Sequence, residues 1–115
     1  MAKPAPFITS AANADFQPRF EYGHMAQAAV VTNADHDTAL GTGFGRLKDA
    51  EIPWTIKYDE VIYVIEGQLT VRTGGTDLIV DAGACIWLPK GTELVYLAEN
   101  ALIFYAIHPA NWAEG

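Results

Sequence analysis

The stretch that decides the fold lies in the middle of the chain and reads Tyr58-Asp59-Glu60-Val61-Ile62-Tyr63-Val64-Ile65-Glu66-Gly67-Gln68. It joins a carboxylate to a run of β-branched and aromatic residues that stops at a glycine, which is typical of a β-strand. A second stretch, Gly83-Ala84-Cys85-Ile86-Trp87-Leu88-Pro89-Lys90-Gly91, repeats the plan of a strand that ends in a Pro/Gly turn. Together they predict the two halves of a small β-barrel with a pocket inside.

The alternation of residue types from position 54 onward assigns side chains to the two faces of a strand. One face carries Trp54, Ile56, Tyr58, Glu60, Ile62 and Val64. The other face carries Thr55, Lys57, Asp59, Val61, Tyr63 and Ile65. If the first face lines a barrel, a carboxylate lies in an apolar pocket.

We expect an extended N-terminal arm over residues 1–20 and one folded domain over residues 21–115. The arm contains three prolines among small and polar residues, a composition that disfavours strand pairing. Roughly eight or nine short strands and no helix are expected after it. The expected strands are 26–32, 40–47, 54–65, 69–73, 78–80, 84–88, 93–97 and 101–108, with loops or turns that include 49–53, 66–68 and 99–100. This pattern predicts an all-β fold, a single-domain jelly-roll β-barrel that limits exposed sheet edges.

Glycine alternates with other residues at positions 41, 43 and 45. Glycine inside a strand marks a bend or a close approach of two backbones. A phosphate-binding loop would need a helix to follow it, and none is expected here.

Composition places the chain in the class of single globular domains. It has 115 residues, 50% of them hydrophobic, and a net charge of −7 with only 7 Lys and Arg residues. This balance argues against nucleic acid and against anionic membrane surfaces as partners. It is compatible with a cationic small ligand, because an acidic protein attracts one, although solubility alone also accounts for it.

The single cysteine, Cys85, excludes an intrachain disulfide and fits a reducing compartment. Its place in an apolar run predicts a buried, inert thiol. The N-terminus lacks the apolar core of a signal peptide, and no stretch approaches the roughly 20 apolar residues of a membrane span. We therefore expect a cytoplasmic protein.

The two quoted stretches resemble the two motifs of the cupin superfamily. Glu60 and Gly67 have the spacing that ends the first motif, and Gly83, Pro89 and Gly91 have the spacing of the second. The match covers about residues 40–108 and implies the cupin jelly roll.

A cupin metal site usually combines three imidazoles with one carboxylate, donors that suit first-row transition metals. Here the histidine positions of the first motif carry Trp54 and Ile56, or Pro53 and Thr55 with the longer spacing, and that of the second motif carries Leu94. Of the ligand set the resemblance implies, only the glutamate is retained.

The three histidines of the chain, His24, His36 and His108, lie outside both motifs, although His24 and His108 could meet in space. We expect no metal and no cofactor. The alternative is a metal-dependent cupin enzyme, a lyase, isomerase or oxygenase, with displaced ligands.

A closer resemblance is to the EutQ-type cupins of ethanolamine utilisation. It is carried by residues 54–61, 64–69, 89–92 and the C-terminal Pro109-Ala110-Asn111-Trp112. The longer members have an N-terminal region that this chain lacks. The resemblance implies a link to ethanolamine and acetyl-group metabolism in bacterial microcompartments, with an acetate-kinase role, but no phosphate-binding loop in this sequence supports nucleotide chemistry.

Glu60 has three possible roles in an apolar pocket, where desolvation raises the pKa of a carboxyl. It could act with Tyr58 as a catalytic acid or base. It could bind a cationic ligand, with Tyr58 or Trp54 offering a cation–π face. It could also hydrogen-bond internally and have no further function.

Further ligand-binding candidates come from the later strands. Tyr96 shares the parity of the interior position 94 and is a candidate wall of the pocket, whereas Glu93 has the opposite parity and is expected at the rim. Lys90, in the tight turn after Pro89, is a candidate to reach an anionic group of a substrate, or it is simply solvated. Trp112 is expected to pack against the barrel or a partner.

An outward apolar stripe of Val61, Tyr63 and Ile65 predicts a homodimer, unless the N-terminal arm covers it. Three function classes follow for the whole chain. It is a metal-free binding or accessory protein for a small polar metabolite such as an amine, an enzyme that uses Glu60 and Tyr58, or the metal-dependent cupin named above.

Overall fold

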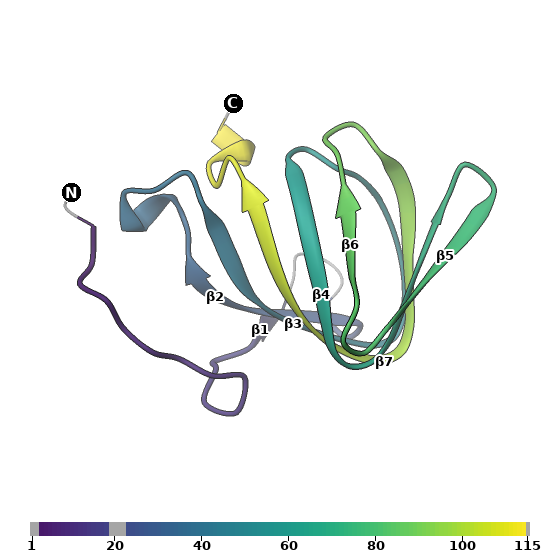
Figure 1. Cartoon of the computed structure of the whole chain (residues 1–115), viewed down its shortest axis with the longest axis horizontal. Helices are drawn as coiled ribbons and strands as arrows, with labels where there is room; N and C mark the ends of the chain where they lie inside the picture. The colour runs from purple at the N-terminus through teal and green to yellow at the C-terminus, as the bar shows by residue number, and fades with distance from the viewer. Residues whose placement is uncertain (1–2, 19–22, 115) are drawn as a thin grey trace.

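The computed structural model describes residues 3–18 and 23–114, which form one curved antiparallel sheet system (Figure 1). Within these residues, two short 3-10 helices accompany the strands. The elements in chain order are β1 (Gln17–Pro18), β2 (Ala26–Thr32), η2 (Ala34–His36), β3 (Gly41–Thr55), β4 (Asp59–Thr73), β5 (Thr76–Asp81), β6 (Cys85–Leu88), β7 (Glu93–His108) and η3 (Trp112–Glu114).

The strands pair in the order β1-β2-β3-β7-β4-β5, and β6 pairs with β4 beside this path. Neighbours such as β3 and β7 are far apart in sequence, which is the long-range pairing expected of a jelly roll. The prediction of an all-β jelly roll is confirmed. Within the described residues, however, no ladder joins β5 or β6 to β1 or β2, so the expected closed barrel is replaced by an open, strongly curved sheet.

Three of the predicted chain breaks are wrong, because β3, β4 and β7 run through them. Residues 49–53 belong to β3, residues 66–68 to β4 and residues 99–100 to β7. In β3 the bend is at Asp49, with a φ of 45°, and in β4 it is at Gly67, with a φ of 79°. A left-handed residue bends a strand without ending it, so a composition typical of turns is found here inside strands.

The single strand expected over 54–65 is two strands in the structure. β3 ends at Thr55, and β4 begins at Asp59. The connection is held by two backbone hydrogen bonds, from the Ile56 amide to the Thr92 carbonyl at 2.9 Å and from the Gly91 amide to the Ile56 carbonyl at 2.8 Å. The two-residue alternation of faces nevertheless persists across the connection.

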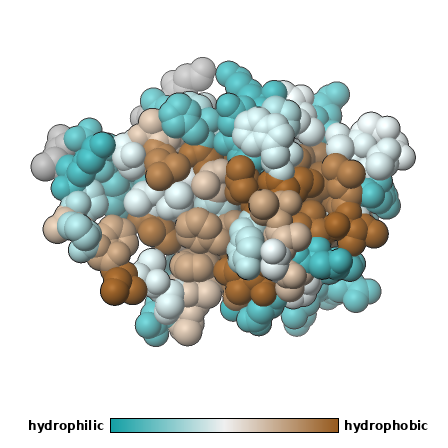
Figure 2. Space-filling model, viewed as in Figure 1, coloured by the Kyte–Doolittle hydropathy of each residue, from teal (hydrophilic) through white to brown (hydrophobic). Residues whose placement is uncertain are grey.

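The outward face of β4 is apolar, as predicted, and it continues onto β6. Val61 and Tyr63 are 40% and 44% exposed, and Val61 is paired with Trp87, which is 59% exposed. Cys85 lies opposite Tyr63 and is also exposed, so the prediction of a buried thiol is wrong: β6 turns this residue to the outer face. Figure 2 shows apolar side chains gathered over β4, β5 and β6 on the viewed face.

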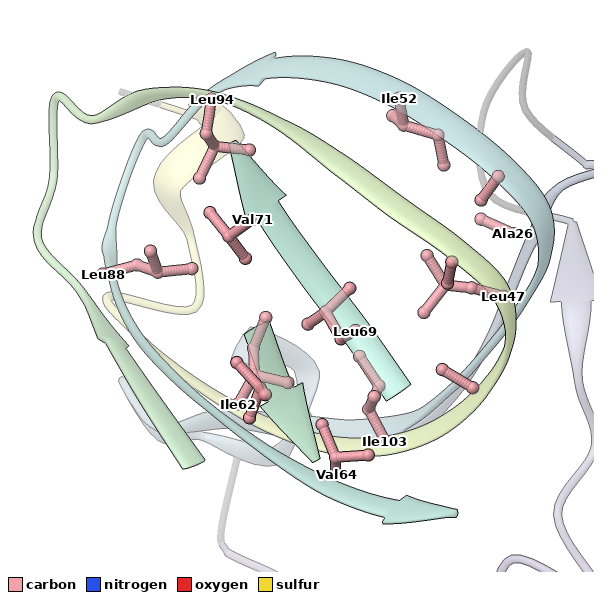
Figure 3. Packing of buried hydrophobic residues seen from close by; sticks show 14 of the residues in the cluster. Ala26, Leu47, Ile52, Ile62, Val64, Leu69, Val71, Leu88, Leu94 and Ile103 are labelled. Atoms are coloured by element: carbon pink, nitrogen blue, oxygen red, sulfur yellow. The ribbon is translucent and has the colours of Figure 1, made fainter. Parts of the chain in front are cut away.

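The inward face of the curved sheet holds the core (Figure 3). Ile62, Val64, Leu69 and Val71 of β4 are at most 2% exposed and point into the space between the strands. Each such side chain contributes about 1.5–3 kcal/mol when it leaves water. The core fills one part of the interior and leaves a cavity in another.

The glycines of β3 are positions of close approach, as predicted, and most of the atoms that come near them belong to side chains of β7. Gly41, Gly43 and Gly45 lie directly opposite Ile107, Tyr105 and Ile103. A Cβ atom on Gly43 would lie 2.6 Å from the Tyr105 hydroxyl oxygen and 2.7 Å from the Ala29 carbonyl oxygen. These glycines therefore leave room for the β7 side chains that form one wall of the interior.

The N-terminal arm runs apart from the sheet, makes a turn at residues 11–13 and reaches the sheet at β1 (Figure 1). The expected boundary at residues 20 and 21 lies outside the described residues, as do residues 1–2. Among the described residues, no helix has the length and apolar character needed to cross a membrane.

Candidate functional site

A cavity of about 120 Å³ lies on the inner side of the sheet, between β2, β3, β4 and β7. Its walls combine aliphatic residues with one carboxylate and four aromatic rings. The lining residues are Ala26, Gln27, Ala28, Gly45, Arg46, Leu47, Ile52, Trp54, Tyr58, Glu60, Ile62, Leu69, Tyr96, Ile103, Tyr105 and Ile107.

Glu60, the acidic residue of this cavity, is only 6% exposed. It is the second residue of β4 and is flanked in the sheet by Leu88 of β6 and Ile107 of β7. The Tyr96 hydroxyl donates a hydrogen bond of 2.9 Å to its Oε1 atom. A carboxylate in such surroundings is costly to bury unless donors or a cation compensate for the lost water.

Trp54, Tyr58, Tyr96 and Tyr105 supply the aromatic part of the wall. Trp54 is at the end of β3, Tyr58 precedes β4, and the other two belong to β7. Aromatic faces carry partial negative charge and attract cations. The cavity thus presents one acidic side chain and several weakly negative ring faces, with Arg46 as the one basic residue among the described residues that line it.

Of the residues predicted to bind a ligand, Trp54, Tyr58, Glu60 and Tyr96 line this one cavity. Lys90 does not line it. It lies exposed in the turn after β6, where its backbone amide donates a hydrogen bond of 3.0 Å to Asp59 Oδ1. A role of Lys90 in ligand binding stays a prediction.

Two further expectations concern positions outside the cavity. Asp59 and Glu93 are exposed, as their parity predicts. Trp112 contacts the rings of Trp54 and Tyr58, so the prediction that it packs against the sheet system is confirmed.

Sequence reasoning missed Tyr105, the third tyrosine of the wall. Its signal was present in the alternation of Ile103, Tyr105 and Ile107, which places the three side chains on one face of β7. The glycines opposite them were a second signal, because bulky β7 side chains occupy the space that these glycines leave.

Comparison with known proteins identifies the family. Residues 15–114 match the family model described as ethanolamine utilisation protein EutQ. The chain belongs to the EutQ family. One relative is the acetate kinase EutQ of Escherichia coli K12, which is 33% identical over 90 residues, a match that covers 77% of this chain and 39% of that protein. The chain therefore spans less than half the length of this EutQ relative.

Solved structures agree with the family assignment and with the cupin fold. The crystal structure of an EutQ protein from Salmonella typhimurium LT2 superposes with a TM-score of 0.84 at 25% identity, covering 90% of this chain and 86% of that chain. An RmlC-like cupin from Shewanella frigidimarina superposes with a TM-score of 0.73 at 14% identity, covering 96% of this chain and 97% of that chain, which is a likeness of fold alone.

At the cupin motif positions, this EutQ chain carries side chains other than the donors of the superfamily's metal site. The motif positions carry Ile56 and Leu94, both buried in the core, and the indole of Trp54. Within residues 3–18 and 23–114, no three His, Cys, Asp or Glu residues come together as a metal-binding group. His24 and His108 are exposed and do not line the cavity.

Proposed function

We propose that this EutQ-family chain binds a small cationic metabolite, an amine of the ethanolamine type, in the cavity around Glu60. The proposal is supported by one observation above all, a carboxylate only 6% exposed within an aromatic-lined cavity. A bound ammonium group would offset the cost of burying this charge, and the rings of Trp54 and Tyr58 would add cation–π attraction.

The charge of the whole chain favours the same class of ligand. At a net charge of −7, the chain attracts cations and repels anions before any contact is made. Arg46 also lines the cavity, but its guanidinium lies 5.1 Å from the centre of the Phe16 ring, and Phe16 is not a lining residue. Because the guanidinium is near a ring outside the lining, we expect Glu60 and the aromatic faces to set a preference for a cation.

The size of the cavity limits the ligand. A volume of about 120 Å³ is slightly below the roughly 150 Å³ that accommodates benzene in an engineered protein cavity. A ligand of about four to six non-hydrogen atoms is therefore expected, which includes ethanolamine. A nucleotide would extend beyond this volume, so the acetate-kinase activity in the name of the longer Escherichia coli relative is not what we propose for this cavity.

The same geometry is compatible with proton transfer. Glu60 and Tyr58 line one cavity, so a ligand held there could exchange a proton with either side chain. We include weak catalysis by these two residues as the second candidate function, favoured by their shared cavity. Whether it binds an amine or catalyses a reaction weakly, the chain is proposed to act in ethanolamine-type metabolism, in the cytoplasm or in association with a microcompartment.

Isothermal titration calorimetry with ethanolamine tests the binding proposal. Glu60→Gln keeps the size of the side chain but removes its charge, and it should weaken binding about tenfold or more, because hydrogen bonds to charged groups contribute about 1.5–3 kcal/mol. Glu93→Gln removes an exposed carboxylate that does not line the cavity and serves as the matched control. Equal affinity in wild type and Glu60→Gln, or no binding to wild type, would contradict the proposal.

A homodimer through the outer face of β4 and β6 is the second part of the proposal. Val61, Tyr63 and Trp87 are all exposed, so the described part of the arm leaves them accessible. An uncharged face is where two copies of an acidic chain can meet with the least repulsion.

A further inference from the structure

The C-terminal segment returns to the candidate site after β7 ends. The amide of Ala110 donates a hydrogen bond of 2.8 Å to the carbonyl of Ala39, which ties the segment to the connection between β2 and β3. η3 follows and carries Trp112, which is half-buried against the core. Figure 1 shows this end of the chain beside the end of β7.

Trp112 contacts two rings of the cavity wall at once. Its ring centroid lies 5.9 Å from that of Trp54 at an interplanar angle of 82°, and 5.2 Å from that of Tyr58 at 58°. Edge-to-face and tilted arrangements in this distance range are attractive. Trp112 itself does not line the cavity, and it contacts the wall through these two rings.

The rings of Trp54 and Tyr58 lie at the connection between β3 and β4. Trp54 is the penultimate residue of β3, and Tyr58 lies between β3 and β4. In the described ladders Trp54 pairs with Leu94, whereas Tyr58 occupies no ladder position. Trp112 is one of the side chains that contact the Tyr58 ring and contribute to its orientation.

We propose that Trp112 is a positioning residue of the cavity, which holds Trp54 and Tyr58 in the orientation that receives a cation. This inference rests on the proposed function for its ligand but concerns a residue outside the cavity. The C-terminal segment then contributes to the binding site. Removal of the Trp112 ring lowers the affinity for an ammonium group although every residue that lines the cavity is unchanged.

The binding experiment compares Trp112→Ala with Phe7→Ala by calorimetry with ethanolamine. Phe7 is the control because it is an aromatic residue that is 51% exposed and does not line the cavity. Trp112→Ala should weaken binding about tenfold, the scale of a lost cation–π contact, and Trp112→Phe should restore affinity to within about threefold. If Trp112→Ala does not fold, Trp112→Leu keeps the apolar packing and takes its place.

A second measurement separates this inference from the proposed function. The chain has 3 tryptophans, so fluorotryptophan labelling gives fluorine NMR resonances that single substitutions assign. Trp112→Ala, or Trp112→Leu in its place, should shift or broaden the Trp54 resonance, and Phe7→Ala should not. If the Trp54 resonance is unchanged in the Trp112 variant, the inference is wrong whatever the binding data show. It is also wrong if the Trp112 variant binds ethanolamine with the affinity of the wild type. A shifted resonance in a protein whose wild type binds no ethanolamine supports the positioning role and overturns the proposed ligand.

Discussion

The hydroxyl of Tyr96 on β7 donates a hydrogen bond of 2.9 Å to Glu60 Oε1 on β4, across the cavity that both residues line. The two residues are 36 positions apart in sequence, and the antiparallel pairing of β4 with β7 brings their strands together. The bond connects the candidate site to the fold, because it stabilises the buried carboxyl and fixes its direction.

Removing the Tyr96 hydroxyl should therefore destabilise the protein. Tyr96→Phe takes one donor from a carboxyl that is buried, and a cost of about 1–3 kcal/mol in the free energy of unfolding is expected. Urea denaturation measures it. Tyr63→Phe removes a hydroxyl from an exposed tyrosine on the outer face and should change stability by less than about 0.5 kcal/mol. Equal values for the two variants would show that the Tyr96 bond contributes nothing to stability.

Gly67 should tolerate no side chain. Its φ is 79°, and a Cβ atom there would lie 2.0 Å from the carbonyl oxygen of Asn100, a backbone atom of β7 that cannot move aside cheaply. Gly67→Ala should cost more than about 3 kcal/mol or prevent folding. Gly74→Ala is the control, because its φ is 59° but no atom lies within 4 Å of the added carbon.

Gly74→Ala should lower the free energy of unfolding only by the cost of a non-glycine residue in the left-handed region, about 1–2 kcal/mol. Thermal unfolding of both variants separates this backbone cost from the steric clash at Gly67. A Gly67→Ala protein as stable as Gly74→Ala would show that β4 can straighten at this bend.

The faces of the strands could be predicted from the sequence, whereas their lengths could not. Alternation is a local property, so the inward positions of Tyr58, Glu60 and Tyr96 followed from parity alone. Whether Gly67 ends a strand or bends it depends on what pairs across it, and Asn100 on β7 is remote in sequence. The strand ends that were predicted wrongly from local composition are therefore set by pairing between residues that are remote in sequence.

The site was predictable in part for the same reason. Trp54, Tyr58 and Glu60 lie close together in sequence and were predicted to share one strand face. Tyr96 was predicted to line the pocket because it lies two residues after the interior position 94. Cys85 was misplaced because an apolar run reads as buried, although β6 is a strand with one face outward. The contact of Trp112 with the wall depends on how the chain turns after β7, which no local pattern encodes.

Gly45 and Ile103 should show coupling in a double-mutant cycle. A Cβ atom on Gly45 would lie 2.9 Å from Ile103 Cγ1 and 3.1 Å from its Cδ1, with the nearest backbone oxygen at 4.0 Å, so the clash is with one stiff side chain. Gly45→Ala should cost about 1–3 kcal/mol and Ile103→Ala about 2–5 kcal/mol. Because Ile103→Ala removes the clashing atoms, the double variant should cost less than the sum, as measured by urea denaturation. Additive values would contradict this close packing of β3 against β7.

The hairpin of β4 and β5 should show a pH-dependent contribution from Asp77. Arg72 lies opposite it in the register and donates a hydrogen bond of 2.8 Å from Nε to Oδ1; this bond holds the pKa of the Asp77 carboxyl below its usual value. A lowered pKa means that the stabilisation is present above the unfolded pKa of about 3.9 and is lost as the pH falls through the lower folded value. Asp77→Asn should therefore lower Tm slightly at pH 7 and not at pH 2, since both side chains are exposed. An equal Tm deficit at both pH values would show that the ion pair is not its cause.

The proposed homodimer should depend on the outer face of β4 and β6. Trp87 is 59% exposed and lies opposite Val61, so a charge at this position would be buried against the same charge of a second copy. Trp87→Glu should convert the dimer to a monomer in size-exclusion chromatography with light scattering, because like charges brought together at an interface cost several kcal/mol. Leu40→Glu places the same charge on an exposed apolar residue just before β3 and should leave the dimer intact. A monomeric wild type would contradict the dimer, and dissociation by Leu40→Glu alone would move the interface to the tip of β2 and β3.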